Sequence, residues 1–190
     1  TERCGELDPN DLAEYRRGGG FEALSTVVSS SPTTVIEAIT ASGLRGRGGA
    51  GYPTGRKWAL VHSVPAAVKY VVCNGDEGDP GAYMDRSLME GNPFSVLEGL
   101  LIGAYAIGAG EGYVYIRQEY PLAVTNLGIA IKKAREHGLL GSDILGSGFD
   151  TTFANNSVTF TNGALGSVTA STATSLTVSL STPPTTAGDL

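Results

Sequence analysis

The sequence predicts an α/β fold for its first 150 residues, followed by a short all-β tail. Two β-rich apolar runs, 69–73 and 112–116, alternate with two long helical patterns, 93–109 and 121–137. Such alternation indicates a parallel sheet with helices packed on its faces. The composition changes near residue 150, beyond which the chain is rich in Ser and Thr and holds a single charged side chain.

A small helical lead-in is expected before the sheet. Apolar residues recur at helical spacing in 9–17 and again in 21–29. Ser31 followed by Pro32 is typical of an N-cap and a first-turn proline, so a third helix begins there. Glycine-rich sequence follows it, and the first predicted strand comes after that.

The tail predicts three short strands. Apolar residues alternate with Ser and Thr around 158–160, 165–168 and 176–180, and Asn162-Gly163 lies between the first two runs as a hairpin signal. We therefore predict three parts: a helical lead-in with the glycine-rich loop (1–55), a sheet domain (56–150) and a β segment (151–190).

Composition excludes several function classes. The chain has 13 basic and 19 acidic side chains, so a nucleic-acid backbone would meet net repulsion. No run approaches the roughly 20 apolar residues that a membrane span requires. Cys4 and Cys73 lie far apart and form no C-x-x-C pair, which gives no zinc or cluster motif. Cys73, His62 and His137 are interpreted as structural or surface residues.

The glycine-rich stretch 43–58 carries four cations, a tyrosine and a tryptophan. Glycines let successive backbone N–H groups approach phosphate oxygens, while Arg47 and Lys57 neutralise the charge and Tyr52 offers a stacking face. The spacing matches neither common nucleotide-loop template. A phosphate-binding loop and a flexible linker therefore both stay open at this point.

An acidic loop directly follows the first predicted strand. It contains Asn74, Asp76, Glu77 and Asp79, at the strand end where parallel-sheet proteins build their sites. Carboxylates there accept hydrogen bonds from ribose hydroxyls and ring N–H groups. A solvated turn and an oxygen-ligand metal site are the alternatives.

Two linked motifs carry a family resemblance. GLRGRGGAGYPTGRKW at 43–58, followed by CNGDEGDPGAYMDR at 73–86, resembles the NADH- and FMN-binding flavoprotein subunit of respiratory complex I (NADH dehydrogenase) and of NAD-linked hydrogenase diaphorases. The resemblance includes CGELDP, PFSVLEG, EGYVYIRQEYP and GLLGSDILGSGFD, and so covers nearly all of residues 1–150. The form GDPGAYMDR favours the hydrogenase branch.

The resemblance implies an incomplete Rossmann-like sheet and an oxidoreductase in which NADH reduces FMN and electrons pass to iron–sulfur clusters. No side chain need act as a nucleophile or base. The family's pattern, carried onto this sequence, implies FMN contacts from Gly46, Arg47, Gly48, Lys57, Asn74 and Asp76. It likewise implies NADH contacts from Gly49, Tyr52, Lys57, Glu77 and Asp79.

The same resemblance implies a partner subunit with a thioredoxin-like [2Fe-2S] domain and a cytoplasmic location, peripheral to the membrane in complex I. Tyr52 stands where the family commonly has Phe, and Gly75 where it commonly has Ala, and both exchanges are expected to be tolerated. The family continues after Asp150 with the rest of the flavin pocket and a cysteine-bearing domain, so we expect no [4Fe-4S] cluster in this chain.

The tail resembles bacterial immunoglobulin-like surface repeats, and the pentapeptide at 146–150 suits both families, as expected of a chimera. Three hypotheses follow. The chain is a flavin-dependent oxidoreductase fragment, a structural or cell-surface β module with an inherited flavoprotein fold, or a non-functional chimera.

Overall fold

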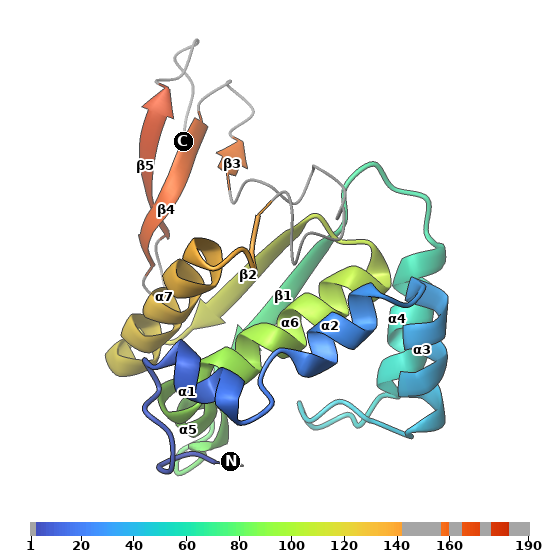
Figure 1. The fold of residues 1–190 in the computed structure, drawn as a ribbon, viewed down its shortest axis with the longest axis horizontal. Helices are drawn as coiled ribbons and strands as arrows, with labels where there is room; N and C mark the ends of the chain where they lie inside the picture. Colours follow the sequence, from blue (N-terminus) through green and yellow to red (C-terminus); the bar gives the residue numbers. More distant parts are fainter. Residues whose placement is uncertain (1–2, 142–156, 160–164, 172–175, 183–190) are drawn as a thin grey trace.

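The computed structural model describes residues 3–141, 157–159, 165–171 and 176–182. Helices dominate the first range and pack against one face of a small sheet (Figure 1). Its elements, in chain order, are α1 (Leu12–Arg17), α2 (Glu22–Val28), α3 (Pro32–Ala41), α4 (Thr54–Ser63), β1 (Tyr70–Gly75), α5 (Met84–Gly91), α6 (Pro93–Ile107), β2 (Glu111–Ile116) and α7 (Pro121–Glu136).

The two predicted strands form a parallel pair, which confirms the α/β prediction. In register, Tyr70 lies opposite Glu111 and Gly75 opposite Ile116. Helices α5 and α6 form the crossover between them, as parallel strands require. Both strands therefore end on the same edge, where the acidic loop after β1 meets the segment after β2.

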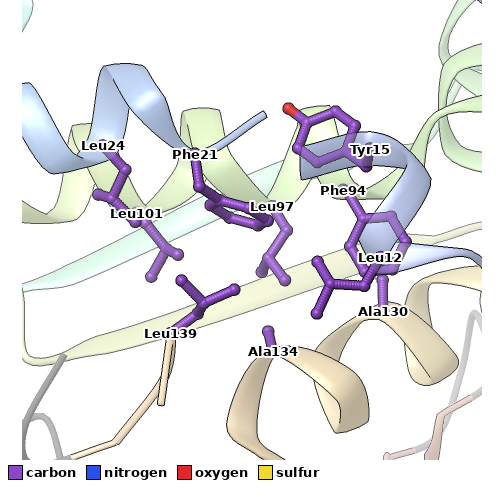
Figure 2. Close-up of a cluster of buried hydrophobic side chains, with 10 residues drawn as sticks. All are labelled: Leu12, Tyr15, Phe21, Leu24, Phe94, Leu97, Leu101, Ala130, Ala134 and Leu139. Carbon is purple, nitrogen blue, oxygen red and sulfur yellow. The ribbon is translucent and has the colours of Figure 1, made fainter. Parts of the chain in front are cut away.

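Helix α6 is the centre of the hydrophobic core. Nine of its fifteen residues are buried. One face of α6 packs with the lead-in helices and with α7, and Figure 2 shows how these side chains converge. This cluster consists of Leu12, Tyr15, Phe21, Leu24, Phe94, Leu97, Leu101, Ala130, Ala134 and Leu139. The lead-in and the sheet region thus share a core.

A buried carboxylate joins the lead-in to α6. Glu98 is only 7 % exposed and accepts hydrogen bonds from the Tyr15 hydroxyl (2.6 Å), Phe21 N (2.9 Å) and Leu24 N (3.1 Å). Two of these donors belong to the start of α2, whose own N-cap residue provides no side-chain cap. The pKa of Tyr15 is raised, mainly by burial and secondly by the hydrogen bond to Glu98.

Local capping explains where the predicted helices begin and end. Asp11 accepts from Ala13 N and Glu14 N at the start of α1. Ser31 accepts from Thr34 N, and Pro32 occupies the first turn of α3, as predicted. Gly108 ends α6 with a φ of +73°, a conformation that favours glycine.

The structure contains two helices, α4 and α5, that the sequence pattern does not predict. Helix α4 begins directly after the glycine-rich loop, and α5 follows the acidic loop. Helix α4 packs against α3 and α6, and its Trp58 lies against Gly103. Each candidate ligand-binding loop is therefore held at the N-terminus of a helix.

One face of the small sheet is open among the described residues. Tyr70, Val72, Tyr113 and Tyr115 are between 37 and 61 % exposed, whereas Gly75 and Ile116 are buried on the opposite face. The Tyr70 and Tyr113 rings lie 5.9 Å apart. Parallel sheets are usually covered on both faces, so this exposure is unusual.

The tail contains β3 (Ser157–Thr159), β4 (Leu165–Ser171) and β5 (Leu176–Thr182), which pair antiparallel in the order β3-β4-β5. Three strands therefore lie where the alternation predicts them. The proposed hairpin turn, Asn162-Gly163, lies outside the described residues. Within the described part of the chain, no helix combines the length and the hydropathy needed to cross a bilayer.

Candidate functional site

The glycine-rich loop is closed at its base by backbone hydrogen bonds. Gly46 N donates to Tyr52 O (2.9 Å), and Thr54 N donates to Leu44 O (2.9 Å). Arg45 adds a side-chain bond from Nη1 to Gly51 O (3.1 Å). The loop is therefore ordered by its own contacts, which disfavours the flexible-linker interpretation.

Glycine is required at particular positions of this loop. Gly49 and Gly51 have φ values of +94° and +59°, which L side chains rarely adopt. A Cβ added at Gly48 or Gly49 would meet no atom within 4 Å, so the backbone there is open to an approaching group. The loop consequently exposes a stretch of backbone that a ligand can reach.

The first turn of α4 continues the loop with two cations. Pro53 is the N-cap residue and provides no side-chain cap, and the first turn contains no acidic residue. Arg56 and Lys57 are exposed there, and none of the ion pairs in the described part of the chain involves them. Arg56 lies 5.9 Å from the Tyr52 ring. Helix polarity and charge both favour an anion at this end of α4.

The end of β1 forms a second group of predicted site residues. Asn74 Oδ1 accepts from Asp76 N at 3.0 Å, so the chain turns immediately after the strand. Asn74, Asp76 and Asp79 are exposed. Their amide and carboxylate groups are available to a ligand that approaches the carboxyl edge of the sheet.

Glu77 differs from its neighbours because its carboxylate already has partners. Its Oε1 accepts from Met84 N (2.8 Å) and Asp85 N (3.2 Å), and its Oε2 accepts from Arg86 N (3.2 Å). Glu77 therefore caps the first turn of α5 from seven residues upstream. Because three backbone N–H groups already donate to it, the Glu77 carboxylate has less capacity to accept hydrogen bonds from a ligand than the sequence alone suggests.

Two residues after β2 contact the acidic loop and were missed by sequence reasoning. Arg117 Nη1 donates to Glu77 O at 2.8 Å, and its Nε lies 3.7 Å from Asp76 Oδ1. The Tyr120 hydroxyl donates to the same Glu77 oxygen at 3.3 Å. The strand-end rule that selects Asn74 and Asp76 also selects Arg117, because both strands end at one edge.

Two titratable groups lie beside this edge. Burial, with the nearby Glu77 carboxylate, raises the pKa of Asp85. Burial, with the negative charge of Asp85, raises the pKa of the Cys73 thiol. A raised thiol pKa opposes nucleophilic reactivity. This agrees with the interpretation of Cys73 as a structural residue.

The predicted site residues thus fall into two ordered groups. The first comprises Lys57 in the first turn of α4 and five residues of the preceding loop, Gly46, Arg47, Gly48, Gly49 and Tyr52. The second comprises Asn74, Asp76, Glu77 and Asp79 at the end of β1. Among residues 3–141, no hydrogen bond or ion pair joins the two groups directly, although α4 and β1 both pack on α6. In Figure 1 the loop extends below α3 and α4, and both strands point to the lower left.

Among the described residues, no three His, Cys, Asp or Glu side chains lie close enough together to hold a metal ion. Of the three interpretations of the acidic loop, the metal site therefore has no geometric support in this part of the chain.

Comparison with known proteins agrees with the motifs. The chain is 53 % identical over 150 residues to the NADP-reducing hydrogenase subunit HndC of Solidesulfovibrio fructosivorans, covering 79 % of this chain and 30 % of that protein. It is 45 % identical over 147 residues to an NADH-quinone oxidoreductase subunit of Escherichia coli strain K12, covering 76 % and 33 %. The chain thus spans about a third of the curated relatives that it matches.

A solved structure shares the arrangement of about half of the chain. The crystal structure of an NAD⁺-reducing [NiFe]-hydrogenase in the air-oxidised state matches with a TM-score of 0.53 at 36 % sequence identity, covering 56 % of this chain and 19 % of that one. The profile of the Nuo51 FMN-binding domain matches residues 39–188, which contain both candidate loops. The chain belongs to the Nuo51 FMN-binding domain family.

Proposed function

We propose that this chain provides part of the FMN and NADH site of a flavoprotein subunit, in which NADH reduces FMN and electrons continue to iron–sulfur clusters. The observation that carries the proposal is the family match across both loops. FMN, when bound, accepts a hydride and releases single electrons, which is chemistry that no side chain supplies. The residues of this chain bind and orient the two cofactors.

The loop and the start of α4 fit the phosphate of FMN. The backbone is open at Gly48, and Gly46 lies at the base of the loop, where its N–H donates to Tyr52 O. Arg47 and Lys57 supply positive charge and form no ion pair within the described residues. Asn74 and Asp76, at the end of β1, provide an amide and a carboxylate for the polar edge of the flavin or its ribityl hydroxyls. These six residues are the proposed FMN contacts.

NADH is proposed to contact Gly49, Tyr52, Lys57, Glu77 and Asp79. Tyr52 is 43 % exposed, and its ring offers a stacking face. Asp79 is exposed, and its side chain suits a ribose hydroxyl. Glu77 contributes mainly through the backbone geometry that it fixes, because its carboxylate is occupied by α5.

The relatives are subunits of a hydrogenase and of a quinone oxidoreductase, which supports a wider assembly for this chain. We infer a multi-subunit complex, with a thioredoxin-like [2Fe-2S] subunit as the electron acceptor and a location on the cytoplasmic side. The two cysteines of this chain, Cys4 and Cys73, are too few for a [4Fe-4S] cluster. The three-part division at residues 55 and 150 also stays a proposal. The cell-surface alternative gains no support from the relatives that match.

The proposed site is tested by titrating the purified chain with FMN and measuring binding as the quenching of flavin fluorescence. We expect saturable quenching, and Lys57→Ala should weaken FMN binding about tenfold because a charge-assisted contact to phosphate is lost. Riboflavin, which has no phosphate, should bind weakly and be insensitive to Lys57→Ala.

The matched control is Lys132→Ala, which removes the same charge from the exposed face of α7, where Lys132 pairs with Glu136 at 3.8 Å. Its FMN affinity should equal that of the wild type. Equal FMN and riboflavin affinities in all three proteins would show that Lys57 does not meet the phosphate. A wild-type chain that fails to quench FMN would contradict the proposed function.

A further inference from the structure

We propose that Arg117 is a positioning residue: it ties the segment after β2 to the acidic loop after β1 and so fixes that loop for flavin nucleotide binding. The proposal rests on the proposed FMN site. It adds a residue that the motif comparison leaves without a role. The contacts that carry it are called the strand-end clasp here, formed by Glu77, Arg117 and Tyr120.

The clasp holds one backbone carbonyl from two directions. Arg117 Nη1 donates to Glu77 O at 2.8 Å, and the Tyr120 hydroxyl donates to the same oxygen at 3.3 Å. The Arg117 guanidinium also lies 5.9 Å from the Tyr120 ring. Because β1 and β2 are in parallel register, these donors sit directly beside the acidic loop.

The guanidinium is itself held in place. Its Nε and Nη2 donate to the two carboxylate oxygens of Glu119 at 3.3 and 3.0 Å, a bidentate arrangement that fixes the plane of the fork. The side chain of Arg117 is 27 % exposed, whereas that of Glu119 is 63 % exposed. The Arg117 donor to Glu77 is thus oriented before any ligand arrives.

Glu77 is anchored at its other end by α5. Its carboxylate accepts three backbone N–H groups of the first turn of that helix, at 2.8 to 3.2 Å. The Glu77 carbonyl is held by the segment after β2 and its side chain by α5, so Glu77 has little conformational freedom. The two exposed carboxylates on either side of it are therefore presented in a fixed geometry.

The positive charge of Arg117 also offsets the negative charge of the acidic loop. The loop and the start of α5 gather Asp76, Glu77, Asp79 and Asp85, which repel one another and would repel an anionic cofactor. Arg117 is the cation nearest to Asp76, at 3.7 Å. Arg86, the other cation here, instead pairs with Glu90 at 2.9 Å. Removal of Arg117 should thus both loosen the loop and leave its negative charge uncompensated.

The experiment compares three variants of the full chain: Arg117→Ala, Arg117→Lys and Arg86→Ala. Arg86 is a matched control, because its guanidinium lies 5.4 Å from the same Tyr120 ring but its side chain makes no bond to the acidic loop in the described structure. Each protein is measured for FMN affinity by fluorescence quenching, for thermal unfolding, and for amide hydrogen exchange of residues 78–82 without ligand.

We expect Arg117→Ala to weaken FMN binding about tenfold and to speed exchange at 78–82, while the unfolding temperature stays close to that of Arg86→Ala. Arg117→Lys should restore part of the affinity, because the charge returns without the fork geometry. Arg86→Ala should match the wild type in both affinity and exchange.

Two results would overturn the inference while leaving the proposed function intact. One is wild-type FMN affinity and unchanged exchange in Arg117→Ala. The other is equal losses in Arg117→Ala and Arg86→Ala, which would show a general effect of charge or stability. Absence of FMN binding by the wild type would contradict the proposed function itself, and with it the role assigned to Arg117.

Discussion

Gly75 occupies the last position of β1, directly against the Met89 side chain. A Cβ built there would lie 2.2 Å from Met89 Cε and 3.0 Å from Tyr115 O. We predict that Gly75→Ala costs about 1 kcal/mol in the free energy of unfolding, because the flexible end of Met89 must move aside and the added methyl lies close to Tyr115 O. Urea denaturation measures the cost.

Met89→Val provides the check on that mechanism. The shorter side chain makes room for the methyl, so the double variant should lose less stability than the sum of the single losses. Strict additivity, or a Gly75→Ala protein as stable as the wild type, would show that Met89 does not restrict this position. The sequence pattern could not reveal this constraint, because it depends on a residue of α5.

Cys73 should react slowly with alkylating reagents. Its pKa is raised by burial and by the charge of Asp85, and the thiolate is the reactive form. Asp85→Asn removes that charge and thus lowers the Cys73 pKa, so alkylation near pH 8 should become faster. The alkylation rate at a series of pH values, measured by mass spectrometry of the Cys73 peptide, tests the direction of this pKa change. A slower or unchanged rate in Asp85→Asn would contradict it.

Helix α6 and the start of α2 depend on each other through Glu98. Replacing Glu98 with Ala leaves Phe21 N and Leu24 N without their acceptor in a buried setting, and we predict a loss of about 3 kcal/mol in unfolding free energy. Tyr15→Phe removes only one of the three donors and should cost about 1 kcal/mol. Similar losses in both variants would show that Glu98 does not stabilise the start of α2.

The elements that the sequence predicts well are those with complete local signals. Helix α3 has a Ser cap and a first-turn proline, α6 ends at a glycine, and both strands of the parallel pair are continuous β-rich runs. Helix α5 lacks such a signal: only Met89 is buried, and the cap is Glu77, seven residues away. A cap supplied by tertiary structure cannot be read from local pattern.

The candidate site shows the same division. Motifs identify the glycine-rich loop and the acidic loop, because glycines and carboxylates are visible in the sequence. They do not identify Arg117, whose contact with Glu77 spans 40 positions and exists only because β1 and β2 are parallel neighbours. Motifs also could not show that the Glu77 carboxylate is occupied by α5.

At the scale of the whole molecule, one face of the β1–β2 sheet is apolar and exposed among the described residues. Val72 is 61 % exposed and Tyr115 46 %, on a two-stranded sheet that is small for independent stability. We predict concentration-dependent self-association through this face, since exposed apolar sheet surfaces favour association. Analytical ultracentrifugation measures it.

The double variant Val72→Thr/Tyr115→Thr should reduce this association and keep the fold, because Thr suits strands and is polar. Leu122→Ser is the control: Leu122 is 52 % exposed but lies on α7, away from the sheet face, so association should persist. A wild-type chain that stays monomeric at every concentration would contradict the prediction.

The effect of FMN on amide hydrogen exchange across the whole chain tests whether the two loops bind one ligand. If the glycine-rich loop and the acidic loop surround one flavin nucleotide, FMN should slow exchange in 46–57 and in 74–79 together, with the same concentration dependence. Protection confined to one segment, or to neither, would contradict the account, because the two loops would then not share a ligand.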